Sequence, residues 1–312
     1  MTITALVLNY NNYLDLKNCL MSLRRQILPD NYELKIVIID NHSLDGSTAR
    51  IQAEFPDYAY IYNTANLGFA AGVNQGIKKF WDESDFFLLA NNDATLAPDC
   101  LKNLLAAAEL NSAVVNEPSE LSESSEPNGG LYGPAIFYQS APEKIWQGGG
   151  YFSRARMNVR VPDKNKPLLN RERRAVDFVS GCIMLIDKKV LAAIGLLDEN
   201  FFFYGEDLDL GLRAKTAGFK IIYEPRAAAW HNISEIAISR TSPWVLKNLA
   251  KSYFLIIRKH FPRRRLYGLA LFIFIYTPWR LGQIIRGHNN LKNILAWFKG
   301  AYDGLSAKLT KT

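Results

Sequence analysis

The sequence predicts an α/β fold in which a mostly parallel sheet is flanked by helices. Residues 3–8, 34–39 and 86–90 form short apolar runs that are typical of buried strands. Each run is followed by polar residues, as expected where a strand opens into a loop. Helix-length stretches separate the runs, and this order implies parallel pairing through right-handed crossovers.

The other elements follow from similar patterns. Leu16, Leu20, Leu23 and Ile27 recur at three- and four-residue intervals and predict an amphipathic helix. Further strands are expected at 58–62, 132–138, 178–186 and 221–223, extended by 227–231, and further helices at 99–110, 187–194 and 206–215. Residues 111–130 are rich in Ser, Glu, Pro and Asn, so we expect an exposed, mobile insertion there.

Composition bounds the class of protein. The chain has 312 residues, of which 48% are hydrophobic, enough for a real core. Cys19, Cys100 and Cys182 are far apart, which disfavours a disulfide framework or a zinc site and fits a reducing compartment. The start of the sequence lacks a basic segment, so no signal peptide is expected.

Charge is unevenly distributed. From Arg240 onward there are 14 Lys or Arg and one acid, which gives +13, and the preceding residues carry 23 bases and 29 acids, which gives −6. A basic tail suggests a polyanionic partner, either nucleic acid or an anionic membrane surface.

One polar cluster, Asn91-Asn92-Asp93, follows the apolar run at 86–90. Ligands of open α/β sheets bind at the carboxyl ends of strands, so Asp93 is a candidate ligand for a hard cation. The alternative is a simple turn, because Asn and Asp are usual turn residues.

A denser polar cluster lies at residues 201–210, where aromatic residues precede Glu206, Asp207 and Asp209. Asp207 or Glu206 is a candidate general base facing a cleft. The alternative is that these acids stabilise a helix N-terminus, with Arg213 as the partner of Asp209. His231 follows a predicted strand and is either a metal ligand or a satisfied side chain.

Glycines recur every fourth residue at 68, 72 and 76 and would share one face of a helix. That face would allow close approach of a ligand or of the sheet. The spacing fits neither a Walker A loop nor a dinucleotide fingerprint.

Taken in order, these segments resemble the inverting family 2 glycosyltransferases of the GT-A fold, and in particular their rhamnosyltransferase-like branch. The resemblance rests on the segments at 6–11, 38–47, 66–76, 91–93 and 204–218. It implies a GT-A catalytic domain at about 1–240, divided into a donor half (1–110) and an acceptor half (131–240). Residues 241–312 would form a helical region that associates with a membrane.

The resemblance also implies roles for individual residues. Asp207, with Glu206, would deprotonate the acceptor hydroxyl, and Asp93 and His231 would hold Mg²⁺ or Mn²⁺ at the diphosphate of the donor. The expected nucleotide-sugar contacts are Leu8, Asn9, Tyr10, Asp40, Asn41, Asp45, Asn66, Gly72, Asn74 and Asn92. The expected acceptor contacts are Trp146, Gly181 and Cys182. Asn91 replaces the first acid of the family's DxD motif, which should weaken cation binding.

In the tail, a basic knot at 258–265 precedes 14 uncharged residues at 266–279, interrupted at Pro278. A spanning helix needs roughly 20 apolar residues. We therefore expect an interfacial helix on anionic lipid, and the alternative is a helix pair that packs on the catalytic domain. Nucleic acid is disfavoured because basic and apolar residues share one segment.

The sequence thus favours a cytoplasmic enzyme, peripheral on the inner face of the membrane, that moves rhamnose from dTDP-rhamnose to a lipid-linked polysaccharide precursor. Two alternatives stay open: a transferase that uses a UDP-hexose or a galactofuranose donor, and a catalytically weak subunit that binds sugar nucleotides.

Overall fold

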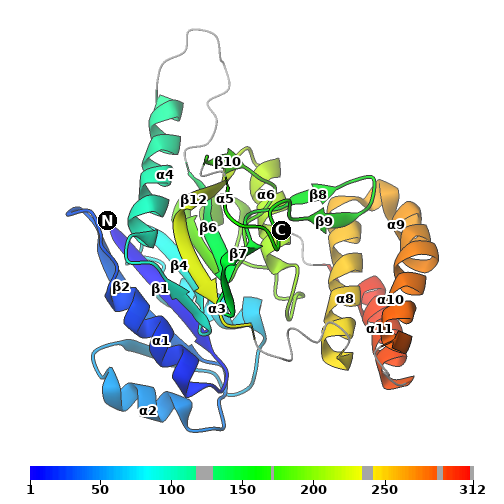
Figure 1. Ribbon diagram of the computed structural model, residues 1–312, viewed down its shortest axis with the longest axis horizontal. Helices are drawn as coiled ribbons and strands as arrows, with labels where there is room; N and C mark the ends of the chain where they lie inside the picture. Colours follow the sequence, from blue (N-terminus) through cyan, green and yellow to red (C-terminus); the bar gives the residue numbers. More distant parts are fainter. Residues whose placement is uncertain (117–128, 170–171, 234–241, 287–290, 310–312) are drawn as a thin grey trace.

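A computed structural model describes residues 1–116, 129–169, 172–233, 242–286 and 291–309 (Figure 1). The strands are β1 (Thr2–Asn9), β2 (Glu33–Asp40), β3 (Ala59–Tyr62), β4 (Phe86–Asn91), β5 (Ala94–Leu96), β6 (Gly130–Tyr138), β7 (Ala141–Gln147), β8 (Tyr151–Ser153), β9 (Asn158–Arg160), β10 (Arg174–Ala175), β11 (Ile183–Asp187) and β12 (Lys220–His231). The helices are α1 (Tyr13–Arg24), α2 (Ser47–Glu54), α3 (Phe69–Lys79), α4 (Cys100–Asn116), α5 (Lys188–Ile194), α6 (Glu206–Thr216), α8 (Pro243–His260), η1 (Pro262–Arg264), α9 (Arg265–Leu271), η2 (Phe272–Tyr276), α10 (Thr277–Arg286) and α11 (Leu291–Ser306).

The central sheet has the strand order β10-β12-β6-β11-β4-β1-β2-β3. Strands β4, β1, β2 and β3 run parallel, and β11 joins them to the parallel pair β6 and β12 by running antiparallel to both β4 and β6. The chain passes from β1 to β2 and β3 on one side and then to β4 on the other. This reversal makes a crevice at the carboxyl ends of β1 and β4, where α/β proteins bind ligands.

Helices cover both faces of the sheet. Side chains alternate between the two faces along each strand, and the apolar ones on each face are buried by helices. Ile3, Ala5 and Val7 of β1 pack with α1, α2 and α4, whereas Leu6 belongs to a second buried cluster with α3, α5 and α6. The predicted α/β architecture with a mostly parallel sheet and a helical C-terminal region is therefore confirmed.

The helix predicted at 99–110 is longer than expected, because α4 continues to Asn116. Asn111 is buried and its amide donates hydrogen bonds to the Gly129 carbonyl and the Tyr132 hydroxyl. These contacts tie a polar residue into the fold, which composition alone could not indicate. The rest of the expected insertion, residues 117–128, lies outside the described residues.

The C-terminal helices stand together beside the sheet (Figure 1). They have an apolar cluster of their own, in which Phe254 of α8, Phe272 of η2 and Trp297 of α11 are buried. Gly300 allows α11 to approach α8 closely, since a Cβ at that position would lie 2.1 Å from the Lys247 carbonyl oxygen. The tail thus folds as a packed helical layer.

The interruption predicted at Pro278 does not occur, because α9, η2 and α10 follow one another without a gap from Arg265 to Arg286. Proline lacks the N–H that would bond the carbonyl four residues earlier, and its ring crowds that carbonyl. The π-helical segment Phe272–Tyr276 ends two residues before Pro278 and contains Phe274, the residue whose carbonyl Pro278 would crowd, and such a widened turn relieves this conflict. Among the described residues, no helix is both long and apolar enough to cross a bilayer.

Candidate active site

A cleft of about 440 Å³ is lined by residues from both halves of the catalytic region. Its lining includes the residues predicted to bind metal, acceptor and the acceptor proton: Asp93, His231, Trp146, Gly181, Cys182, Glu206 and Asp207. They come from sequence positions more than a hundred residues apart. The polar clusters that follow β4 and precede α6 therefore share one site.

Asp93 and His231 lie side by side at one end of this cleft. The Nε2 atom of His231 is 3.0 Å from Oδ1 of Asp93. Strand pairing sets this distance, because His231 of β12 lies opposite Ala94 of β5 in the sheet. The ring of Trp146 packs against His231, with 4.3 Å between the ring centroids.

This pair fits a divalent cation as part of a site that a substrate would complete. The Nδ1 atom of His231 is buried and has no hydrogen-bond partner among the described residues. Those residues contain no group of three or more His, Cys, Asp or Glu side chains that could hold a metal. A carboxylate and an imidazole would thus supply two ligands, and diphosphate and water oxygens would supply the others.

Glu206 and Asp207 begin α6, where the helix dipole favours negative charge. The two carboxylate oxygens of Asp207 accept hydrogen bonds from the backbone N–H groups of Leu208, at 2.7 Å, and Gly181, at 3.3 Å. Burial raises the pKa of Asp207 above its ordinary value. Gly181 and Cys182, predicted as acceptor contacts, therefore lie beside the candidate base.

Glu206 is more deeply buried than Asp207, with 7% of its surface exposed. Its Oε2 atom has no hydrogen-bond partner among the described residues. Burial, and then the charge of Asp207, raises the pKa of Glu206 to about 8. At neutral pH Glu206 is therefore mostly protonated, and it can donate a hydrogen bond into the cleft.

The loop before α6 is held by α8. Tyr204 has a positive φ of 68°, which is uncommon for a residue with a side chain. The Ser252 hydroxyl of α8 donates a 2.5 Å hydrogen bond to the Tyr204 carbonyl, and the Tyr204 ring lies near Trp244. Gly205 follows with a φ of 93°, and a Cβ there would lie 3.1 Å from Ser252 Cβ. Helix α8 thus fixes the approach to Glu206 and Asp207.

Asp209, one turn further along α6, is fully buried in an ion cluster. Its carboxylate is 2.8 Å from Nε of Arg213, 2.9 Å from Nζ of Lys259 and 2.8 Å from Nε2 of His260. Lys259 also contacts Asp198 at 2.8 Å. The predicted partner Arg213 is therefore joined by two residues of α8, and we name these five residues the Asp209 cluster.

Several side chains that were predicted to contact the nucleotide form hydrogen bonds to other groups of the protein. Asn9 is fully buried, and its amide donates to the hydroxyls of Ser43, Ser47 and Thr48 and accepts from Asn92. These bonds tie the end of β1 to the loop after β2 and to the end of β4. Asn9 therefore holds the segments at this edge of the sheet together through its buried hydrogen bonds.

Asn41 makes similar contacts within the protein, and its partner Asn66 lies at the surface. Asn41 is buried, its amide nitrogen donates to Asn66 Oδ1 at 2.9 Å, and its Oδ1 accepts from the backbone N–H of Leu67 at 3.0 Å. Asn74 lies further away on α3 and bonds the backbone of Leu197. Buried amides need such partners, so Asn74 joins α3 to the segment before α6 and does not face the cleft.

The glycine face of α3 packs on the sheet. A Cβ at Gly72 would lie 2.6 Å from a methyl group of Leu8, and one at Gly76 would lie 2.6 Å from a methyl group of Leu6. The glycine spacing therefore serves close approach of helix and sheet rather than of a ligand. Gly72 and Leu8 act as packing partners beneath the predicted donor site.

The remaining predicted donor contacts lie at the strand ends. Asn9 pairs with Asp40 in the register of β1 and β2, so Tyr10 and Asp40 lie at adjacent carboxyl ends. Tyr10 is 48% exposed, and its ring is open to a ligand. Asp45 accepts hydrogen bonds from the backbone of Ser47 and Asn12, which orders the loop after β2.

A family model described as glycosyl transferase family 2 matches residues 4–195. The chain belongs to this family. Its curated relatives include N-acetylglucosaminyl-diphospho-decaprenol L-rhamnosyltransferase of Mycobacterium tuberculosis, 26% identical over 64% of this chain and 66% of the relative. The low-salt glycan biosynthesis hexosyltransferase Agl10 of Haloferax volcanii is 24% identical over 70% of this chain and 63% of its own length. The match spans just under two thirds of these relatives.

Solved structures share the fold. GalNAc-T7 with UDP, GalNAc and Mn²⁺ gives a TM-score of 0.60 at 16% identity, covering 82% of this chain and 47% of that one. Residues 1–349 of S. aureus TarS give 0.57 at 14% identity, covering 97% and 80%. A mannosyltransferase of Pyrobaculum calidifontis, in complex with GDP-Man and Mn²⁺, gives 0.53 at 16% identity, covering 98% and 76%. The predicted GT-A fold and family 2 membership are both confirmed.

Within this family 2 chain, the cleft has lining residues that the sequence did not suggest. Lys164, Ser180 and Leu249 contribute to it, and so does Arg280 of the C-terminal region. Ser180 precedes two predicted residues, so a wider window around Gly181 could have found it. Arg280 reaches the cleft only through the packing of α10 on η2 and α11, which has no local signal in the sequence.

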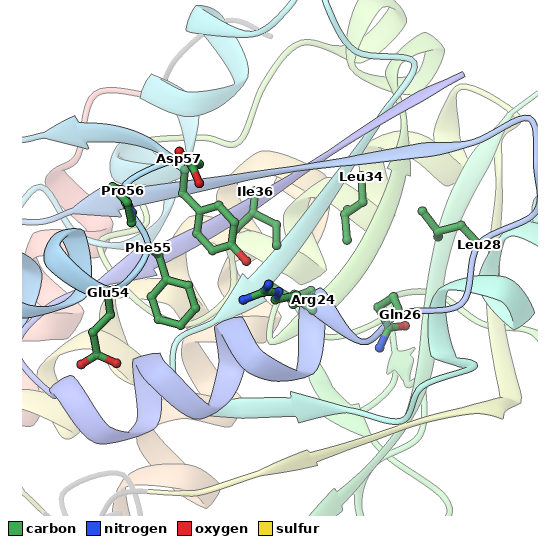
Figure 2. A pocket seen from close by; sticks show the side chains of 11 residues that line it. Arg24, Gln26, Leu28, Leu34, Ile36, Glu54, Phe55, Pro56 and Asp57 are labelled. Carbon is green, nitrogen blue, oxygen red and sulfur yellow. The ribbon is translucent and has the colours of Figure 1, made fainter.

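A separate cavity of about 420 Å³ lies near the start of β2 and contains none of the predicted site residues. Figure 2 shows Arg24 of α1 beside this cavity, with Leu34 and Ile36 of β2 and with Phe55. It lies away from the carboxyl ends of β1 and β4, where the polar clusters meet. We therefore assign the candidate active site to the 440 Å³ cleft.

The raised pKa of Glu206 predicts a pH-dependent stability. Between its ordinary pKa of 4.5 and about 8, the unfolded chain ionises while the folded chain keeps the proton, so folding loses free energy as pH rises. Glu206→Gln removes this loss. We expect its melting temperature to match the wild type near pH 5 and to exceed it increasingly up to pH 8. Parallel melting curves of both proteins from pH 5 to 9 would contradict a buried, protonated Glu206.

Proposed function

We propose that this chain is an inverting glycosyltransferase that moves a sugar from a nucleoside-diphosphate sugar to a lipid-linked acceptor. The observation that carries the proposal is the shared cleft of Asp207 and the Asp93–His231 pair. Inversion requires a base on one side of the anomeric carbon and stabilisation of the leaving diphosphate on the other. Two separate polar groups in one cleft meet that requirement.

In this mechanism Asp207 accepts the proton of the acceptor hydroxyl as the glycosidic bond forms. Backbone N–H groups hold both of its oxygens, which fixes the carboxylate within the cleft. Protonated Glu206 donates a hydrogen bond to the acceptor or donor sugar. Asp93 and His231 would hold the cation, which when bound stabilises negative charge on the departing diphosphate.

For the donor we favour dTDP-rhamnose, because a curated relative is named as a rhamnosyltransferase that acts on a diphospho-decaprenol acceptor. The hexosyltransferase name of another relative supports a UDP-hexose as the second candidate. A catalytically weak binding subunit is the third, since Asn91 replaces an acid.

Sugar-nucleotide binding and product configuration test the proposal together. We expect one member of a panel of dTDP-, UDP- and GDP-sugars to raise the melting temperature with Mn²⁺, because a ligand of the folded state stabilises it. EDTA should abolish turnover and Mn²⁺ should restore it. Retained anomeric configuration in the product, seen by NMR, would reject the inverting mechanism. Binding without turnover on any acceptor would favour the binding subunit.

We further propose that the C-terminal region is a peripheral membrane anchor. Exposed apolar side chains cluster on η2 and α11, including Phe274 at 76%, Leu295 at 59% and Tyr302 at 70%. The basic segment η1, with Arg263 and Arg264, precedes α9 and η2 in the chain. Basic residues beside an apolar face bind anionic bilayers.

Vesicle flotation tests the anchor. We expect the chain to float with phosphatidylglycerol vesicles at low salt and to float less with neutral phosphatidylcholine vesicles. Phe274→Asp should weaken flotation, because it places a charge in the apolar face. Equal flotation of wild type and variant would remove this surface from consideration.

A further inference from the structure

The candidate active site continues into a second cavity at the C-terminal helices. This cavity, of about 330 Å³, is lined by Tyr253, Phe272, Tyr276, Trp279, Trp297 and Val159, and we call it the aromatic groove. Leu249 and Arg280 line both the groove and the catalytic cleft. The two spaces therefore meet at these side chains.

Arg280 places a cation at that junction. Only 7% of its surface is exposed, and its guanidinium lies 4.8 Å from the Trp279 ring centroid and 5.5 Å from that of Trp297. Its Nη1 donates to Gln283 at 2.8 Å. Aromatic faces offset part of the cost of burying this charge. A guanidinium held in this way is suited to bind a phosphate through two parallel hydrogen bonds.

The groove and the cleft differ in chemistry on the two sides of Arg280. On one side lie Glu206 and Asp207, which suit a sugar hydroxyl. On the other side lie aromatic rings, and Trp279, which is 55% exposed, borders the exposed apolar side chains of η2. A ligand that fits all three places has a sugar, then a phosphate group, then an apolar chain.

We propose that Arg280 binds the diphosphate of a sugar-diphosphate-lipid acceptor, and that the first part of its apolar chain occupies the aromatic groove. This inference rests on the proposed function and deepens it, because it names the acceptor subsite. The hairpin of β8 and β9 completes the groove. Its turn accepts hydrogen bonds from Arg264 and Tyr267 at the Arg154 and Ala155 carbonyls.

Binding of farnesyl diphosphate, measured by calorimetry in EDTA and without nucleotide, tests the subsite apart from turnover. We expect the wild type to bind it more tightly than pyrophosphate or farnesol. Arg280→Gln should weaken farnesyl diphosphate binding at least tenfold. Lys102→Gln, which removes an exposed cation of α4 that lines neither cavity, should change it less than twofold. Equal affinity of the Arg280→Gln variant and the wild type, or no binding to either, would overturn the inference.

The aromatic groove is tested by a variant of its own. Val159→Trp changes a 41% exposed residue of β9, so it should leave folding intact while filling the groove. It should weaken farnesyl diphosphate binding but not pyrophosphate binding, because only the former places an apolar chain in the groove. Unchanged farnesyl diphosphate affinity in this variant would count against the groove.

Vesicle flotation of Arg280→Gln distinguishes an acceptor diphosphate from a phospholipid headgroup as the partner of Arg280. The variant should float with phosphatidylglycerol vesicles as the wild type does, and lost flotation would assign Arg280 to headgroups instead. Failure of every sugar nucleotide to bind would reject the proposed function without affecting the farnesyl diphosphate results.

Discussion

Asp207→Asn should lower kcat by about 10²–10⁴-fold, the usual contribution of a general base. Asparagine keeps the shape of the carboxylate, and its single carbonyl oxygen can still accept the shorter backbone bond, from the N–H of Leu208 at 2.7 Å, but its amide nitrogen cannot accept the 3.3 Å bond from Gly181. It cannot take the acceptor proton. Single-turnover kinetics at saturating donor would measure the loss on the chemical step.

Donor binding provides the control for this variant. The melting-temperature shift caused by the donor and Mn²⁺ should be the same in Asp207→Asn as in the wild type. Asp57→Asn, an exposed acid outside the catalytic cleft, should keep full turnover. Turnover by Asp207→Asn within threefold of the wild type would exclude Asp207 as the base. Glu206 would then become the candidate, because it is the other acid of α6 that lines the cleft.

The pH profile adds an independent measure of the same assignment. Burial raises the pKa of Asp207, so the fraction that can accept a proton grows as pH rises above the ordinary range of an aspartate. We expect kcat/KM to rise with pH on the acidic limb of the profile, where Asp207 loses its proton. Since Glu206 is adjacent, the apparent pKa belongs to the pair, and the limb in Glu206→Gln would report Asp207 alone.

Much of the fold could be predicted because the strands are continuous apolar runs with polar ends. The run at 86–90 became β4, flanked by β1 and β11, and nearly all of its side chains are buried. The direction of β11 could not be predicted in this way, since a buried strand looks the same in either orientation. The π-helical segment before Pro278 also depends on its surroundings, because packing of Phe272 on Trp297 holds the helix together there.

The parts of the candidate site that could be predicted are those in which several polar residues are consecutive in the sequence. Asn91-Asn92-Asp93 and Glu206-Asp207 are such clusters, and folding brings them to one cleft. Individual donor contacts were harder to predict, because a motif gives the residue and not the direction of its side chain. Asn74 belongs to the resembling segment but bonds Leu197, 123 positions away. Arg280 depends wholly on tertiary packing.

Asp209→Asn should destabilise the fold by about 3–5 kcal/mol, the usual cost of breaking a buried ion pair. The side chain of Asp209 is fully buried, and Arg213 and Lys259 are nearly so. The amide that replaces the carboxylate leaves Arg213 without a counter-charge and Lys259 with Asp198 alone. Urea unfolding at pH 7 would measure the loss, and Glu83→Gln at an exposed pair with Lys35 should cost less than about 1 kcal/mol.

The pH dependence of this difference identifies its cause. Burial by itself would raise the pKa of Asp209, but the His260 hydrogen bond and the charges of Arg213 and Lys259 outweigh burial and hold the pKa at about 2. A carboxylate with a lowered pKa stabilises the fold above its ordinary pKa of 3.8 and loses this effect as pH falls toward 2. The difference in unfolding free energy between wild type and Asp209→Asn should therefore shrink as pH falls below 4. Lys259 and His260 belong to α8. If the difference in unfolding free energy did not change with pH, α6 and α8 would be joined by packing rather than by charge.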